Sequence, residues 1–184
     1  MSEHPNIGTS MLDTLITSKT RIKLLLKFFL NPESRAYLRA MATEFDESTN
    51  AIRLELNRFE EAGMLESTSE GNRKIFKANM GHPLYHEVRS ILIKYVGIDQ
   101  IIERIISKLG DVREVYLTGD FARGKNSEVI DILIVGNIDK AYLQQLVERT
   151  EQVIKKKVRH LVYSPVEFET MDLNKEENLL IWNG

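Results

Sequence analysis

Gly63 separates a stretch with helical spacing from a stretch with strand spacing, and this change constrains the fold more than any other feature of the sequence. Ahead of it, apolar residues recur at the intervals of one buried helical face, namely Ala51, Ile52, Leu56 and Phe59. The hydroxyl of Ser48 or Thr49 can accept from the free amides of a first helical turn, and glycine is the usual residue at a left-handed helix end. The sequence therefore predicts a helix from Ser48 to about Ala62 that ends at Gly63.

Three shorter elements are predicted ahead of this helix. Residues 17–29 carry one apolar helical stripe, which Pro32 ends, and its members are Ile22, Leu25, Leu26 and Phe29. Residues 34–37 are compatible with a small strand, and residues 38–45 with a short helix whose inward residues are Leu38, Met41, Ala42 and Phe45. The next two residues make a tight turn. Two helices joined by a short turn, the second beginning with small polar residues, are typical of a helix-turn-helix.

A β-hairpin is predicted directly after the long helix. Residues 64–68 and 74–78 have strand-like composition and flank a turn that contains Gly71 and Asn72. The tip of this hairpin offers Arg73 and Lys74 to phosphates or to a minor groove.

The stretch NAIRLELNRFEEAGMLESTSEGNRKIFKAN, residues 50–79, resembles bacterial winged-helix regulators of the ArsR/MarR kind. The likeness extends over residues 17–82. It implies a winged helix-turn-helix domain that binds double-stranded DNA, with its second helix as the recognition helix and its hairpin as the wing.

Under this interpretation, several residues are candidates for DNA contact. Several polar residues of the recognition helix lie away from its apolar face and suit contact with base edges, namely Ser48, Thr49, Asn50, Arg53 and Asn57. Three further cations suit contact with phosphates, namely Arg58, Arg73 and Lys74. The acidic residues of the helix, Glu55, Glu60 and Glu61, are expected to lie at its outer end, beyond the groove. The alternative is that all of these are ordinary solvated side chains.

Charge and composition narrow the function classes. The net charge is −2, with 11 Lys and Arg against 9 Asp and Glu in residues 17–82, so DNA binding must depend on a few placed cations. There are no cysteines, which excludes disulfides, thiolate metal sites and cysteine nucleophiles. The absence of cysteines fits a reducing cytoplasm, where we expect the protein to be. No apolar run approaches the roughly 20 residues of a membrane span, so we expect no membrane partner. Residues 1–16 are expected to form a flexible, loosely ordered arm.

Residues 83–110 are predicted to be connecting helices. The first, residues 83–96, carries the stripe Leu84, Val88, Ile91, Leu92 and Tyr95. After Gly97, residues 98–109 carry the stripe Ile98, Ile101, Ile102, Ile105, Ile106 and Leu109. Helices that are apolar on more than one side are a natural surface for a homodimer, which would suit paired half-sites in DNA. The alternative is that they pack only on the C-terminal half.

Residues 111–184 alternate strand and helix patterns. Strands are predicted at 113–118, 129–135, 158–163 and 178–182, and helices at 139–156 and from Ser164 to about Met171. The second strand is almost entirely apolar, which predicts burial on both faces. The fold class predicted for the whole chain is therefore α+β.

Within this half, GDFARGKNSEVIDILIVG, residues 119–136, resembles the signature of the minimal nucleotidyltransferases of the polymerase-beta-like superfamily. In that family a Gly-Ser turn opens a helix whose amides hold nucleotide phosphates. Two aspartates at i and i+2 of the next strand hold two magnesium ions, and a third carboxylate usually comes from a later strand. The resemblance implies the same frame for residues 111–184.

The residues of that signature are only partly present. The turn matches at Gly119, Ala122, Arg123 and Gly124. Asp120 stands at the position of the family's serine, and Val129 at that of its first metal-binding aspartate, so Asp131 alone remains. The strand at 158–163 supplies no carboxylate. One carboxylate of three does not hold two hard cations against water.

We therefore expect a degenerate nucleotide site, with no metal, no cofactor and no enzymatic activity, formed by Gly119, Asp120, Arg123, Gly124 and Asp131. The alternative is an active magnesium-dependent nucleotidyltransferase that acts on a protein or small molecule, in which Asp120 and Glu128 assist Asp131.

The order of winged helix, connecting helices and nucleotidyltransferase-like domain resembles a bacterial and archaeal family of regulators. The resemblance implies a sequence-specific DNA-binding transcriptional regulator. Its C-terminal domain would then serve for dimerisation or for sensing a nucleotide or other small-molecule effector. A third hypothesis is a protein-interaction module that has lost DNA binding.

Overall fold

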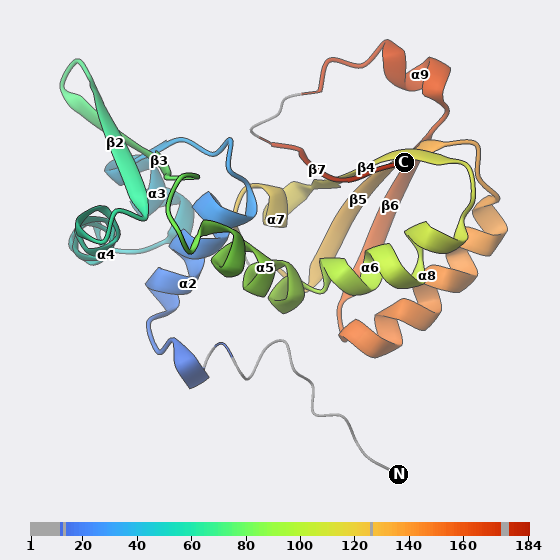
Figure 1. Cartoon of the computed structure of the whole chain (residues 1–184), viewed down its shortest axis with the longest axis horizontal. Helices are drawn as coiled ribbons and strands as arrows, with labels where there is room; N and C mark the ends of the chain where they lie inside the picture. Colours follow the sequence, from blue (N-terminus) through green and yellow to red (C-terminus); the bar gives the residue numbers. More distant parts are fainter. Residues whose placement is uncertain (1–11, 13, 126, 174–176) are drawn as a thin grey trace.

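The computed structural model describes residues 12, 14–125, 127–173 and 177–184, and most of the expected N-terminal arm lies outside these residues. The described helices and strands make an α+β fold, as the sequence predicts. Figure 1 shows a small sheet with its helices at one end of the molecule and a larger sheet with other helices at the opposite end.

The N-terminal half contains short helices and a hairpin. Its elements are α2 (Lys19–Leu25), the π-helical turn η1 (Leu26–Leu30), β1 (Ala36–Tyr37), α3 (Leu38–Phe45), α4 (Thr49–Glu61), β2 (Leu65–Glu70) and β3 (Arg73–Ala78). The strands pair antiparallel in the order β1-β3-β2, and Glu70 faces Arg73 so that Gly71 and Asn72 make the turn. The positive φ of 69° at Gly63 follows the end of α4. The helix predicted at 38–45, the helix predicted from Ser48 to about Ala62 and the predicted hairpin are confirmed.

The first predicted helix is interrupted. α2 ends at Leu25 and the chain continues in the π-helical turn η1, so the helix predicted over residues 17–29 is present, but its second half is π-helical. The wider π-helical turn directs four large apolar side chains into the interior, namely Leu26, Phe28, Phe29 and Leu30. Burial of this cluster is the physical reason for the departure.

The connecting region also differs from its prediction. It contains α5 (Tyr85–Val96), α6 (Ile98–Arg104) and the 3-10 turn η2 (Ile106–Lys108). The buried face of α5 consists of Tyr85, Leu92, Tyr95 and Val96. Two residues of the predicted stripe, Leu84 and Ile91, are 57% and 54% exposed because the buried face is centred on Tyr85 and Leu92. The second predicted helix stops at Arg104, since Ile105 leaves helical geometry at φ −110° and ψ −68°.

The C-terminal half is built on a mixed sheet. Its elements are β4 (Val112–Thr118), α7 (Gly119–Ala122), β5 (Val129–Gly136), α8 (Lys140–Ile154), β6 (Lys157–Tyr163), α9 (Pro165–Glu169) and β7 (Leu179–Asn183). The strand order is β6-β5-β4-β7, in which β5 and β6 are parallel and the other pairs antiparallel. Figure 1 shows α6 and α8 side by side on one side of this sheet and α9 on the other. Residues 132–136 of β5 are all buried, which confirms the strand predicted to be covered on both faces.

The two halves are in direct contact. The side-chain amide of Asn31, just after η1, donates to the backbone oxygen of Ala122 over 3.0 Å, and both groups are buried. Gly124 lies so close to the backbone of Lys27 in η1 that a β-carbon there would overlap it. A single cluster of buried apolar side chains runs from α2 to β7. The glycine turn of the C-terminal half is therefore packed against the N-terminal half.

Candidate nucleic-acid interface and degenerate nucleotide site

The N-terminal end of α4 presents polar side chains to solvent. The hydroxyl of Ser48 accepts a hydrogen bond from the backbone nitrogen of Ala51 over 3.1 Å, so its oxygen serves as the helix cap. Four further candidates for base contact are exposed, namely Thr49, Asn50, Arg53 and Asn57. Arg53 forms no ion pair with any residue that the structure describes. This face of α4 carries hydrogen-bonding groups that the fold does not use.

One of the acidic residues of α4 is paired within the protein. Glu55 is buried, with 7% of its side chain exposed, and accepts from Nε and Nη2 of Arg21 over 2.8 and 3.3 Å. Arg58 donates to the same carboxylate over 3.0 Å. Glu55 therefore lies on the face of α4 that meets α2, and its expected place beyond a DNA groove stays a prediction. The carboxylate ties α4 to α2 and so sets how the helix is presented.

The hairpin is held against α4 by charge. Lys74 donates to Glu60 over 2.6 Å, and this bond, together with one from Ser67, lowers the pKa of Glu60. Arg73 instead lies over the ring of Tyr37, 5.4 Å from its centroid, and remains exposed. Of the three cations expected to meet phosphates, Arg58 and Lys74 thus already have carboxylate partners in the described structure, and Arg73 has an aromatic one.

Arg39 is a further exposed cation that sequence reasoning passed over. It lies in the first turn of α3, and it makes no ion pair within the described part of the chain. The signal was available in the sequence, since Arg39 follows the first inward residue of that predicted helix, Leu38. The first helix of a helix-turn-helix crosses the DNA backbone, where such a cation is useful.

Of the residues expected to form a degenerate nucleotide site, the structure brings Gly119 and Asp131 together. β4 and β5 pair so that Thr118 faces Asp131, and the chain turns at Gly119 with φ +65°. A β-carbon at Gly119 would overlap the carboxylate of Asp131. Glycine is required there both by the backbone angle and by the carboxylate packed against it. The glycine turn therefore lies directly against Asp131.

Asp131 is occupied by an arginine of the neighbouring strand. In the parallel pairing of β5 and β6, Asp131 lies beside Arg159, whose Nε and Nη2 donate to the two carboxylate oxygens over 2.6 and 2.9 Å. This contact, with a smaller contribution from Asp120, raises the pKa of Arg159. The sequence held the signal, since Arg159 is the second residue of the predicted strand 158–163, but only the register of the sheet places it opposite Asp131.

Two magnesium ions do not fit these residues. Val129 offers no ligand, the carboxylate of Asp131 is engaged by Arg159 on both oxygens, and Asp120 is paired with Arg123 over 3.3 Å. No three His, Asp or Glu side chains gather into a metal-binding group in the parts of the chain that are described. Glu128 therefore does not complete a metal site with Asp120 and Asp131.

The turn around α7 is short and covered. α7 is only four residues long, and the turn after it is covered by η1, where Gly124 is buried. A helix this short has little of the dipole that favours phosphate at longer helix ends.

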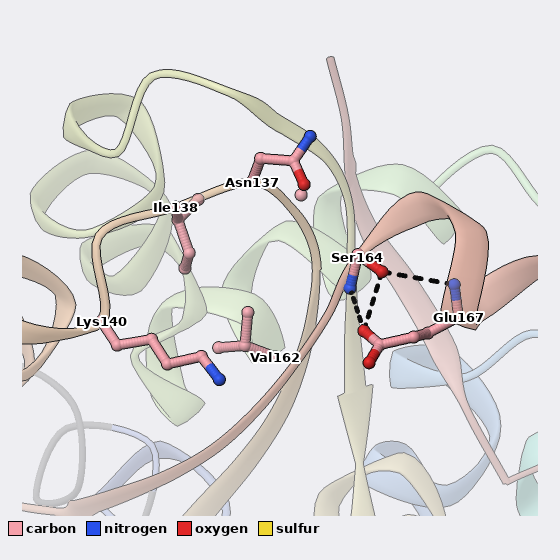
Figure 2. Close-up of a pocket in the computed structure, with 7 residues that line it drawn as sticks. Asn137, Ile138, Lys140, Val162, Ser164 and Glu167 are labelled. Atoms are coloured by element: carbon pink, nitrogen blue, oxygen red, sulfur yellow. Dashed lines mark hydrogen bonds between the residues drawn. The ribbon is translucent and has the colours of Figure 1, made fainter.

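A separate pocket lies at the carboxyl ends of β5 and β6. It encloses about 300 Å³ and is lined by Gly136, Asn137, Ile138, Lys140, Val162, Ser164 and Glu167. Figure 2 shows that Glu167 turns back onto Ser164, whose backbone nitrogen and hydroxyl both donate to it. These bonds lower the pKa of Glu167 and leave its carboxylate committed to capping α9. Gly136 is five residues along β5 from Asp131, or about 16 Å, so the pocket is distinct from the degenerate nucleotide site.

No helix in the described residues has both the length and the apolar composition needed to cross a lipid bilayer.

No family model and no curated protein matches this sequence. Solved structures that resemble part of the chain include AF1382 from Archaeoglobus fulgidus, 22% identical, with a TM-score of 0.36 over 44% of this chain and 91% of that one. Another is a protein from Sulfolobus solfataricus provisionally described as a nucleotidyltransferase, 24% identical, with a TM-score of 0.33 over 50% of this chain and 82% of that one. Likenesses this distant leave the function to be inferred from the residues of this chain.

Proposed function

We propose that this protein is a sequence-specific transcriptional regulator that binds double-stranded DNA through a winged helix-turn-helix formed by residues 17–82. In this proposal α4 enters the major groove and the β2–β3 hairpin is the wing. The C-terminal half is a nucleotidyltransferase-like domain without transferase activity.

One observation carries the proposal, namely the exposed polar face at the start of α4. Thr49, Asn50, Arg53 and Asn57 occupy this face, and the fold leaves Arg53 without an ion pair in the described residues. Arginine and asparagine offer the bidentate donors and acceptors that distinguish guanine and adenine in the major groove. A row of exposed arginine and asparagine side chains near the capped end of a helix therefore suits the recognition of base edges in DNA.

The cations around α4 support backbone contact. Arg73 is exposed on the hairpin and is oriented by the ring of Tyr37, and Arg39 is exposed in α3. Their side chains suit phosphates, which position a protein on DNA without reading its sequence. Arg58 and Lys74 would have to leave Glu55 and Glu60 to reach a phosphate, so we assign them a smaller contribution.

The test measures binding to genomic DNA fragments, recovered with the full-length protein, as a function of salt concentration. The double substitution Arg53→Ala with Arg73→Ala is expected to weaken binding about 10- to 100-fold. Arg53→Ala alone should relax the sequence preference, and Arg73→Ala alone should weaken all sequences alike and reduce the salt slope by about 1.

A matched control removes two exposed cations outside residues 17–82. Lys108→Ala with Arg149→Ala changes the net charge equally and should leave the affinity within about twofold, since neither residue lies near the proposed interface. Absence of binding to any duplex at low salt, or an equal loss in the control, would overturn the proposal.

The second candidate function is magnesium-dependent nucleotidyl transfer, which the retained contact between Gly119 and Asp131 favours. The arginine on Asp131 and the valine at position 129 oppose it. We expect no incorporation of labelled nucleotide in the presence of magnesium, with protein or small-molecule acceptors. Incorporation that Asp131→Ala abolishes would establish the enzyme instead.

A further inference from the structure

One flank of α5 carries apolar and charged side chains that the fold leaves in solvent. They recur at spacings of three and four along the helix, and they are Leu84, just before α5, with Glu87, Ile91 and Lys94 within it. Leu84 is 57% and Ile91 54% exposed. Residues at this spacing share one side of a helix. We refer to these four residues as the α5 flank.

The α5 flank is separate from the surface by which α5 packs in the monomer. That surface is built from Tyr85, Leu92, Tyr95 and Val96, which are all buried. Exposure of two large aliphatic residues on one flank of a helix is typical of an interaction surface when polar groups border it.

The α5 flank carries two opposite charges that are too far apart to form an ion pair with each other. Glu87 and Lys94 are seven residues apart, about 10.5 Å along the helix axis. Neither forms an ion pair with another residue of the described chain. The flank therefore presents an acidic end and a basic end on either side of Ile91.

We propose that α5 packs antiparallel against α5 of a second copy of this chain, across a two-fold axis beside Ile91. Residues at equal distances before and after such an axis face each other. The point midway between Glu87 and Lys94 falls just before Ile91, so with the axis there Glu87 of each copy meets Lys94 of the other. The two Ile91 side chains make the centre, and the Leu84 side chains lie toward the rim.

The charge pattern selects the antiparallel arrangement and a second copy as occupant. A parallel pair would set Glu87 against Glu87 and Lys94 against Lys94, which is repulsive. A surface that is complementary to itself is the form that a two-fold interface requires. The inference rests on α5 alone and does not depend on the proposed binding of DNA, although a two-fold dimer suits paired half-sites.

The experiment measures the mass of the full-length protein in solution by sedimentation over a range of concentrations, without DNA. The wild-type chain is expected to dimerise. Glu87→Lys and Lys94→Glu should each raise the dimer dissociation constant about tenfold or more, because each sets like charges against each other at both ends of the interface. An equimolar mixture of the two variants restores both ion pairs and should form a heterodimer. The doubly substituted chain, Glu87→Lys with Lys94→Glu, should dimerise with itself.

Two controls carry the same charge changes on other exposed positions. Glu103→Lys and Lys108→Glu should leave the dimer dissociation constant unchanged. Circular dichroism is measured for every variant to check that it is folded. A folded Ile91→Asp variant should be monomeric, because it buries two carboxylates at the centre. A monomeric wild-type protein, a dimer that tolerates both single reversals, or a mixture that remains monomeric would each overturn the proposal.

Discussion

Gly124→Ala is expected to lower the free energy of unfolding by about 3 kcal/mol or more, measured by chemical denaturation. Gly124 has φ +78°, where an L-residue costs about 1–2 kcal/mol. Its added β-carbon would also overlap the Cα atom of Lys27 and lie 2.5 Å from the backbone nitrogen of that residue. Because both atoms belong to the backbone of η1, no side-chain rotation relieves the contact. The midpoint of thermal unfolding should fall by about 10 °C.

The matched control for this substitution is Gly71→Ala. Gly71 also has a positive φ, of 59°, but a β-carbon there would have no atom within 4 Å. Only the conformational cost of about 1–2 kcal/mol applies, so the control should lose less stability. Equal losses in the two variants would contradict the close contact between the glycine turn and η1. Since Gly124 lies in the junction of the two halves, its variant also tests whether that junction contributes to folding.

Glu55→Ala is expected to lower the free energy of unfolding by about 2–3 kcal/mol, because two arginines lose the buried carboxylate that they share. Arg21 and Arg58 are partly exposed, with 38% and 54% of their side chains accessible, so water offsets part of the loss. The loss should still exceed that from breaking a salt bridge between two exposed side chains, because Glu55 itself is buried. The affinity for DNA, if the proposed function holds, should fall as well, because α4 loses its attachment to α2.

The control for this variant is Glu61→Ala on the same helix. Glu61 is exposed and forms no ion pair in the described structure, so its removal should change the stability by no more than about 0.5 kcal/mol. Equal stabilities of Glu55→Ala and the wild-type chain would show that hydration of the two arginines compensates fully for the loss of the shared carboxylate.

Most elements near α4 could be predicted because their signals are local. Apolar spacing, the hydroxyl of Ser48 and the glycine at 63 specify a helix and its two ends within 16 residues of sequence. The hairpin follows from two strand-like runs around Gly71. Such patterns depend on the period of the helix or strand itself, so they survive without knowledge of what packs against them.

The same patterns did not predict which face of an element the rest of the chain would cover. Ile91 shares helical spacing with Leu92 and Tyr95, yet it is exposed because the partners of α5 contact the other flank. Glu55 was expected in solvent and is buried because Arg21, 34 positions earlier, pairs with it. Neither outcome has a local signal, since each depends on contacts between elements far apart in the sequence.

The sequence by itself determined that the nucleotidyltransferase-like signature lacks a metal-binding carboxylate at position 129, because residue identity needs no structure. It also determined the helix, the glycine end and the hairpin on which the proposed DNA interface rests. Only the tertiary structure decided that Arg159 neutralises Asp131, and that the turn ending at Gly124 is sealed against η1. Both depend on strand register and on the approach of distant backbones, which pairing and packing settle together across the whole fold.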